Sequence, residues 1–380
     1  MYSRREKDND MKESSLKRQK LSIQNDGEGC TISMDDLYKE KYSINNKGSL
    51  SINTIKISPN GTKFAIGSSD TKVKIFNLSN GELLTELIGH TKGISDLEFS
   101  PINSDIIASC SDDLTIRLWS IKKAQCLKVL KKHTYHVTAV KFSLKGNILI
   151  SGSADETITI WDIVSGITLK TLAAHSDPVL SLALTPDSTM IASASYDGLM
   201  RLFDLETGQC LKTLTYNSSS HGTATASTTD VVNLPISNVT FSPNGKYILS
   251  SSLDGVLRLW DYMNNKVIKT YLGIGGGEVP ISEVYNCSAK FITKTKDPLI
   301  ISGSDKSGLL IWDVQSKKIV YQFKSSDEPV FDIDIYDEGR IIASCSKDGT
   351  INIMEMNPKY FKPTEVNPEA NSLPESPESS

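Results

Sequence analysis

Serine, histidine and aspartate recur together along this chain, and they are the residue types of a nucleophilic catalytic triad. Each of two sets adds a tryptophan at its end: the residues are His90, Ser109, Asp113 and Trp119, and then His133, Ser151, Asp155 and Trp161. A catalytic triad occurs once and needs an exposed nucleophile with oxyanion donors, so a recurring set favours a structural role. The sequence also lacks the GxSxG, Walker, GxGxxG and HExxH motifs. We therefore predict that the chain has no catalytic residues and is not an enzyme.

The triad-like sets belong to a longer repeat. A turn followed by alternating apolar residues recurs, and its copies end at Phe76, Trp119, Trp161, Phe203, Trp260, Trp312 and Met354. Four of the six separations are 42 or 43 residues, and insertions extend the other two to 57 and 52. This period is typical of the WD repeat, in which each unit is a four-stranded blade. The sequence therefore predicts an all-β fold, a seven-bladed WD-repeat β-propeller, because a closed ring of blades buries both faces of each sheet.

The polar sets have a place in such a fold. In a WD repeat the His, the Ser, the turn Asp and the Trp indole N–H form a buried hydrogen-bond chain. This chain satisfies groups that would otherwise cost about 1–3 kcal/mol each. We assign the eight residues above this structural role. In the fourth unit Phe203 replaces the tryptophan, and we expect the hydrogen-bond chain to be broken there.

The propeller is expected to occupy residues 35–356, between two disordered tails. Residues 1–34 are polar and of mixed charge, and residues 357–380 are rich in Pro, Glu and Ser. Because this proline-rich end cannot supply a fourth strand, the alternating segment Leu37–Ser43 is predicted to close the last blade. The Ser-, Thr- and Ala-rich segment 217–234 is predicted to be a flexible insertion.

Charge and cysteine spacing exclude several kinds of partner. The chain has 41 Lys and Arg against 45 Asp and Glu, a net charge of −4, so it lacks the basic excess that direct nucleic-acid binding requires. No run of apolar residues is long enough to span a membrane, and we expect no membrane association. The six cysteines are far apart, without a CxxC pair or a histidine at metal-ligand spacing. We therefore predict no metal and no cofactor.

Residues 191–272 point to a narrower family. The stretch IASASYDGLMRLFDLETGQCLKTLTYN, followed after the insertion by PISNVTFSPNGKYILSSSLDGVLRLWDYMNNKVIKTYLG, closely resembles the fungal form of the WD-repeat subunit of COMPASS-type complexes. HTKGISDLEFS in the second blade resembles it too. Complexes of this type methylate a lysine on the histone H3 tail. The resemblance implies a non-catalytic nuclear scaffold whose partners are a Set-domain methyltransferase subunit, a companion WD-repeat subunit and a histone H3 tail.

The resemblance implies one binding surface at a face of the channel, where the family clamps an arginine side chain between two phenylalanines. Polar positions around that pocket, and a nearby aromatic, are matched by Ser95, Asp112, Ser237 and Tyr196. The two clamping positions fall at Thr138 and Ser288, which have no rings. Ring stacking on a guanidinium contributes about 0.5–2 kcal/mol per face in a desolvated site, so this departure counts against arginine recognition.

A second surface implied by the resemblance is a groove between the fifth and sixth blades, which receives the tail of the companion subunit. The matching positions here are Asn244, Tyr247, Leu259 and Gln315. A purely structural interpretation competes with this one. Leu259 is also what ordinary strand packing requires, and Asn244 is also the residue expected in the SPNGK turn.

Two other functions stay open at this point. The chain could be a WD-repeat adaptor of another assembly, such as a signalling or ubiquitin-ligase complex, and nuclear enrichment with a co-purifying Set-domain protein would separate the two. The basic run Lys17–Lys20 fits a nuclear import signal, although a charge cluster in a solvated tail is the simpler interpretation. An enzyme with a site in the channel is the third hypothesis, which turnover or metal binding by the isolated chain would favour.

Overall fold

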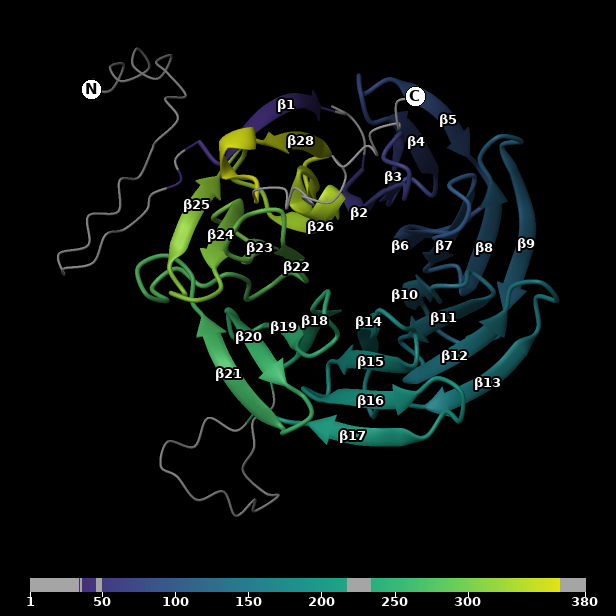
Figure 1. Ribbon diagram of the computed structural model, residues 1–380. Helices are drawn as coiled ribbons and strands as arrows, with labels where there is room; N and C mark the ends of the chain where they lie inside the picture. The colour runs from purple at the N-terminus through teal and green to yellow at the C-terminus, as the bar shows by residue number, and fades with distance from the viewer. Residues whose placement is uncertain (1–33, 35, 46–49, 217–233, 363–380) are drawn as a thin grey trace, which may run out of the picture. The chain divides into compact units, whose positions relative to one another are not determined.

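The computed structural model describes residues 34, 36–45, 50–216 and 234–362. Within these residues the strands form seven four-stranded sheets, and Figure 1 shows the sheets arranged as blades in a ring. The predicted seven-bladed β-propeller is confirmed. Most of the predicted tails and insertion, namely residues 1–33, 217–233 and 363–380, lies outside the described residues.

The first strand of each blade lines the channel and the fourth lies at the rim (Figure 1). Blade 1 contains β2 (Ile52–Ile57), β3 (Lys63–Ser68), β4 (Val73–Asn77) and β5 (Leu83–Leu87). Blade 2 contains β6 (Ile94–Phe99), β7 (Ile106–Ser111), β8 (Thr115–Ser120) and β9 (Gln125–Lys131). Blade 3 contains β10 (Val137–Phe142), β11 (Ile148–Ser153), β12 (Thr157–Asp162) and β13 (Thr168–Ala173). Blade 4 contains β14 (Val179–Leu184), β15 (Met190–Ser195), β16 (Met200–Asp204) and β17 (Cys210–Leu214).

The remaining blades follow the same order. Blade 5 contains β18 (Ile236–Phe241), β19 (Ile248–Ser252), β20 (Val256–Asp261) and β21 (Lys266–Tyr271). Blade 6 contains β22 (Ala289–Ile292), β23 (Leu299–Gly303), β24 (Leu309–Asp313) and β25 (Ile319–Phe323). Blade 7 contains β26 (Val330–Tyr336), β27 (Ile341–Ser346), β28 (Thr350–Met356) and, as its fourth strand, β1 (Tyr38–Asn45). Short 3-10 helices, η1 (Asp337–Gly339) and η2 (Pro358–Tyr360), follow β26 and β28.

The ring is closed by the N-terminal strand. β26 contacts β2, so the first strands form a continuous circle, and β1 pairs with β28 in an antiparallel register that runs from Tyr38 opposite Met356 to Asn45 opposite Thr350. The hydroxyl of Tyr38 also donates to the carbonyl of Gly339, at 2.5 Å. The strand predicted over Leu37–Ser43 therefore appears here as Tyr38–Asn45.

The described chain continues beyond residue 356 to Lys362, and these last residues pack against the ring. The backbone N–H of Asn357 donates to the carbonyl of Leu37 at 2.9 Å, and the hydroxyl of Tyr360 donates to the Asp36 carboxylate at 2.8 Å. Lys362 then donates its backbone N–H to Lys294, at the blade 6 side of the ring. These contacts hold the residues after β28 against both β1 and blade 6.

Apolar side chains are buried between neighbouring blades. One cluster joins Val73 and Leu87 of blade 1 to Ile94 and Trp119 of blade 2, and each of these side chains is at most 1% exposed. Burying a side chain of this size stabilises the fold by about 1.5–3 kcal/mol. The described part of the chain contains no helix long and apolar enough to cross a membrane.

Candidate partner-binding surfaces

The first triad-like set forms a hydrogen-bond chain in blade 2. His90 lies with Nδ1 2.8 Å from the Asp113 carboxylate and Nε2 2.7 Å from Ser109 Oγ. The indole N–H of Trp119 donates to the same Oγ at 2.8 Å. Because Ser109 is fully buried and its hydroxyl already serves two partners, it cannot reach a substrate. The geometry fits the structural role assigned from the sequence.

Burial and hydrogen bonds shift the pKa values of this chain in opposite ways. Burial lowers the pKa of His90, and the Asp113 carboxylate opposes this shift without cancelling it. Burial acts to raise the pKa of Asp113, but hydrogen bonds from Thr115 and His90 outweigh it and lower the value. The hydrogen-bond chain is therefore most stable when the His90 imidazole is neutral and the Asp113 carboxylate is ionised.

Blades 3 and 4 show what the tryptophan adds. In blade 3 the chain is complete: His133 contacts Asp155 at 2.9 Å and Ser151 at 2.7 Å, and Trp161 donates to Ser151 at 2.9 Å. In blade 4 the contacts of His175 with Asp197 and Ser193 persist, at 2.9 and 2.7 Å. The break expected at Phe203 is therefore confined to the missing indole bond.

The channel contains a cavity of about 730 Å³. Four of the residues predicted at the channel face line it, namely Ser95, Thr138, Ser237 and Ser288. The other two, Asp112 and Tyr196, lie in the turns that follow β7 and β15. Asp112 is linked to the cavity wall because it accepts a hydrogen bond from Ser95 at 3.1 Å.

The two residues at the clamping positions use their hydroxyl groups to join blades. Thr138 in blade 3 donates to the carbonyl of Val179 in blade 4 at 2.5 Å. Ser288 before β22 accepts from the backbone N–H of Ile333 in blade 7 at 2.8 Å. These hydroxyls satisfy buried backbone groups of the next blade, which a phenylalanine could not do.

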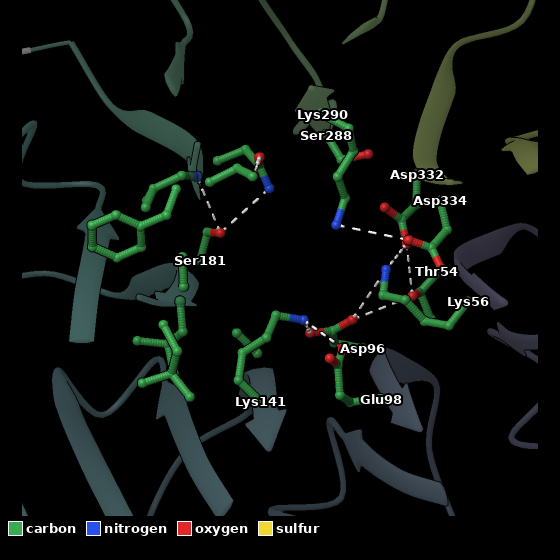
Figure 2. A pocket seen from close by; sticks show the side chains of 18 of the residues that line it. Thr54, Lys56, Asp96, Glu98, Lys141, Ser181, Ser288, Lys290, Asp332 and Asp334 are labelled. Carbon is green, nitrogen blue, oxygen red and sulfur yellow. Dashed lines mark hydrogen bonds and ion pairs between the residues drawn. The ribbon is translucent and has the colours of Figure 1, made fainter. Parts of the chain in front are cut away.

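The channel wall also carries an ion-pair network, which the sequence analysis did not identify (Figure 2). Lys56 of blade 1 pairs with Asp332 of blade 7 and lies 3.7 Å from Asp96 of blade 2. Lys141 of blade 3 lies 3.3 Å from Asp96 and 2.9 Å from Glu98. The network therefore links blades 7, 1, 2 and 3 across the junction between the two ends of the propeller.

Charge pairing outweighs burial at the centre of this network. Burial acts to lower the pKa of Lys56, but Asp332 and Asp96 raise it above its ordinary value. Burial acts to raise the pKa of Asp332, but Lys56 holds it down at about 2. Both groups are thus ionised. A sequence signal existed, since charged residues alternate with apolar ones along the buried first strands in IKI (55–57), DLE (96–98) and DID (332–334).

A pair of aromatic rings also lines the cavity and was not identified from the sequence. The rings of Tyr285 and Phe331 have their centroids 5.4 Å apart. Lys347 donates to the Tyr285 hydroxyl at 2.8 Å and lies over its ring, 4.8 Å from the centroid. The channel wall thus has aromatic rings on blades 6 and 7, although both clamping positions lack them.

Three of the four predicted groove residues come together at the boundary of blades 5 and 6. Leu259 is 5% exposed and packs in one apolar cluster with Tyr247 and Val314. Gln315, the exposed residue after Val314, accepts a hydrogen bond through its side-chain oxygen from Lys269, at 3.0 Å. The result is an apolar base beside an exposed amide.

Asn244 is used in its own turn. Its side-chain oxygen accepts hydrogen bonds from Ser242 Oγ at 2.6 Å and from the backbone N–H of Lys246 at 3.1 Å. This is the arrangement expected of an Asx turn.

Comparison with known proteins places this architecture in a family. The family model described as the WDR5 beta-propeller domain matches residues 44–355, and it indicates no catalytic family. The Polycomb protein EED of Chaetomium thermophilum is 41% identical over 87 residues, which are 21% of this chain and 15% of that relative. The nuclear distribution protein nudF 1 of Talaromyces marneffei is 33% identical over 111 residues, 29% of this chain and 24% of the relative. Pre-mRNA-processing factor 19 of Bos taurus is 33% identical over 96 residues, 25% of this chain and 19% of the relative.

Each of these curated relatives is matched over less than a quarter of its length. The family model, in contrast, covers the ring from within β1 to within β28. The chain therefore belongs to the WDR5 β-propeller domain family.

Proposed function

We propose that this chain is a non-catalytic scaffold subunit of a COMPASS-like histone H3 lysine methyltransferase complex in the nucleus. It holds the Set-domain subunit and a companion WD-repeat subunit. The observation that carries this proposal is the grouping of Tyr247, Leu259 and Gln315 at the boundary of blades 5 and 6. An apolar base with an exposed amide beside it suits an extended peptide, whose side chains need burial and whose backbone needs hydrogen bonds.

The chemistry of the described residues supports a scaffold more than an enzyme. The serines of the triad-like sets are buried, and their hydroxyls are engaged by histidine and indole groups. The channel carboxylates are paired with lysines, so none is poised as a lone general acid or base. Methyl transfer therefore belongs to the Set-domain partner.

The relatives' names support both the proposal and its first rival. A Polycomb protein fits a chromatin role, whereas nuclear distribution protein nudF 1 and pre-mRNA-processing factor 19 fit adaptors of other assemblies.

A histone H3 tail is proposed to enter the channel beside Tyr285 and Phe331. Direct binding of an H3 tail peptide, weakened at least about threefold by Phe331→Ala, checks this part separately.

The test of the scaffold role is co-purification. The full-length chain, tagged in its native cells, is expected to bring down a Set-domain protein and a second WD-repeat protein. Gln315→Arg puts a bulky cation next to Lys269 and is expected to remove the WD-repeat protein while the Set-domain protein is retained. Lys318→Ala, an exposed change on the same turn, is the matched control and should leave both bound.

The choice of Gln315 follows from burial. Leu259→Asp would place an ionised carboxyl in the core and is expected to destabilise blade 5 as well as the surface, so it cannot separate the two effects. Recovery of signalling or ubiquitin-ligase subunits, with no Set-domain protein, would overturn the proposal in favour of the adaptor function.

A further inference from the structure

Blades 2 and 4 share four pairs of polar side chains at equivalent positions. The shared pairs are His90 and His175, Asp113 and Asp197, Arg117 and Arg201, and Cys126 and Cys210. In blade 2 the residue opposite the cysteine is Trp119, and in blade 4 it is Phe203. The chain therefore contains its own comparison for the effect of losing an indole.

In blade 2 the indole fills this position. Trp119 is 1% exposed and donates to Ser109. The guanidinium carbon of Arg117 lies 5.8 Å from the centroid of the indole ring. Cys126 is partly buried against the same apolar cluster.

In blade 4 there is a cavity of about 330 Å³ at this position, which we name the blade 4 notch. Its buried apolar part is formed by Ala174 and Phe203, each 3% exposed, and Ala173 lies beside them. The polar side chains around it are His175, Ser176, Arg201 and the exposed Cys210. The cavity lies where the larger, N–H-bearing ring of blades 2, 3, 5 and 6 is replaced by a phenyl ring.

The guanidinium of Arg201 has unused donors at this notch. All of its hydrogen bonds run through Nη1, which contacts the carbonyl of Ala174 at 2.7 Å, Nδ1 of His175 at 2.9 Å and the carboxylate of Asp197 at 3.1 Å. Within the described residues Nε and Nη2 have no hydrogen-bond partner, and the side chain is 23% exposed. Two free N–H directions in one plane suit a carboxylate, which accepts such a fork with both oxygens.

We propose that the blade 4 notch binds an aromatic side chain of a partner polypeptide whose neighbouring carboxylate is held by Arg201. Ala173, Ala174 and Phe203 give one face of the ring an apolar contact, and aromatic side chains are common anchors of protein interfaces. Arg201 sits at the edge of the same cavity, so ring and carboxylate lie close together in the occupant. This site is separate from the channel and from the boundary of blades 5 and 6.

Disulfide exchange at Cys210 tests the proposal on the full-length chain. The probes are two disulfides with the same linker, one ending in a 4-carboxyphenyl group and one in a cyclohexyl group. The protein is labelled with both probes together in the presence of limiting reductant. Peptide mass mapping then gives the ratio of the two probes at each cysteine. We expect the carboxyphenyl probe to be preferred about tenfold at Cys210, the equivalent of one charge-assisted contact, and not at Cys126.

Three variants make the test decisive. Phe203→Trp fills the notch and restores an indole donor for Ser193, so it should raise the unfolding midpoint in urea while it abolishes the probe preference. Arg201→Gln removes the partner of the carboxylate and should abolish the preference for the carboxyphenyl probe at Cys210. Trp119→Phe should create a preference at Cys126. Equal ratios at Cys126 and Cys210, or a preference that survives Phe203→Trp, would overturn the proposal.

Discussion

The ammonium group of Lys269 in blade 5 donates a hydrogen bond to the carbonyl oxygen of Val314 in blade 6, at 2.8 Å. Lys269 lies on the fourth strand opposite Leu259, and Val314 lies in the turn between the third and fourth strands of the next blade. The contact therefore joins two blades at the rim.

The same contact recurs around the propeller. Lys128 of blade 2 donates to the carbonyl of Ile163 in blade 3 at 3.0 Å, and Lys212 of blade 4 donates to that of Tyr262 in blade 5, also at 3.0 Å. In blade 7 the position is taken by Tyr42, whose hydroxyl donates to Leu78 of blade 1 at 2.7 Å. A side chain at one register position thus ties successive blades together.

Replacing Lys269 should test the strength of one such tie. Lys269→Ala removes the donor to Val314 and is expected to lower the free energy of unfolding by about 1–2 kcal/mol, the value of a partly exposed charge-assisted hydrogen bond. Urea denaturation followed by tryptophan fluorescence measures it. Lys266→Ala, on the same strand but without a side-chain partner among the described residues, is the control and should stay within about 0.5 kcal/mol of the wild type.

The repeat contains these lysines, but nothing in it indicates their partners. CLK (126–128), TLK (168–170), CLK (210–212) and VIK (267–269) show the recurrence in the sequence. Their acceptors are backbone carbonyls, which carry no residue-type signal, and they lie in the following blade. The fold followed from the period, whereas contacts between blades depend on how the sheets pack.

Ser151 and Ser193 should respond differently to the loss of a hydroxyl. Ser151 accepts from the indole of Trp161 and contacts His133, whereas Ser193 contacts His175 and has no indole donor. Ser151→Ala leaves one more buried donor unsatisfied and should cost about 1 kcal/mol more than Ser193→Ala. Paired urea denaturation of the two variants measures this difference, and equal losses would contradict the proposed role of the indole bond.

Asp332 should be among the most sensitive positions in the channel. Asp332→Ala removes the nearest counter-charge of the buried Lys56 and leaves it with the more distant Asp96 and Asp334, which is expected to cost about 3–5 kcal/mol. Combining it with Lys56→Met removes the uncompensated charge, so the double variant should be more stable than Asp332→Ala alone. Thermal unfolding of the three proteins checks the order. A double variant that is less stable than Asp332→Ala would refute this account of the network.

Acid should destabilise the propeller in two ranges of pH. The pKa of His90 is lowered, so below about pH 6.5 the unfolded chain takes up a proton that the folded chain resists. The pKa values of Asp113 and Asp332 are also lowered, the second to about 2, so the unfolded chain again binds more protons as the pH falls below the ordinary carboxyl range. Both effects have the same sign, and stability should decrease as the pH falls.

The measurement is the urea midpoint at about pH 7.5, 5.5 and 3.5 at constant ionic strength. His90→Gln has no imidazole to protonate, so its midpoint should change less between the first two values than that of the wild type. A midpoint that rises on acidification would contradict the assigned directions.

The sequence shows which residue types occupy the channel positions, but it does not show which groups their side chains contact. Thr138 and Ser288 were identified as positions without a ring, yet their hydroxyl bonds to Val179 and Ile333 depend on the spacing of adjacent blades. The ring pair of Tyr285 and Phe331 comes from residues outside the matched motif. Resemblance identifies equivalent positions, but it does not show where a family member places a compensating side chain.

Removing the closing strand should destabilise the whole ring rather than one blade. β1 covers the edge of β28, and Leu37 and Tyr38 are 0 and 5% exposed. Losing these two side chains alone is expected to cost about 3–6 kcal/mol, before the strand's backbone hydrogen bonds are counted.

A chain that begins at Ser51 should therefore unfold in one transition at a clearly lower temperature than a chain that begins at Met34, which keeps β1 and is the matched control. Blades far from the junction should lose stability too, since each buries its face against the next, and hydrogen exchange at β11 and β15 would report it. An unchanged melting temperature for the chain beginning at Ser51 would show that β1 does not close the ring.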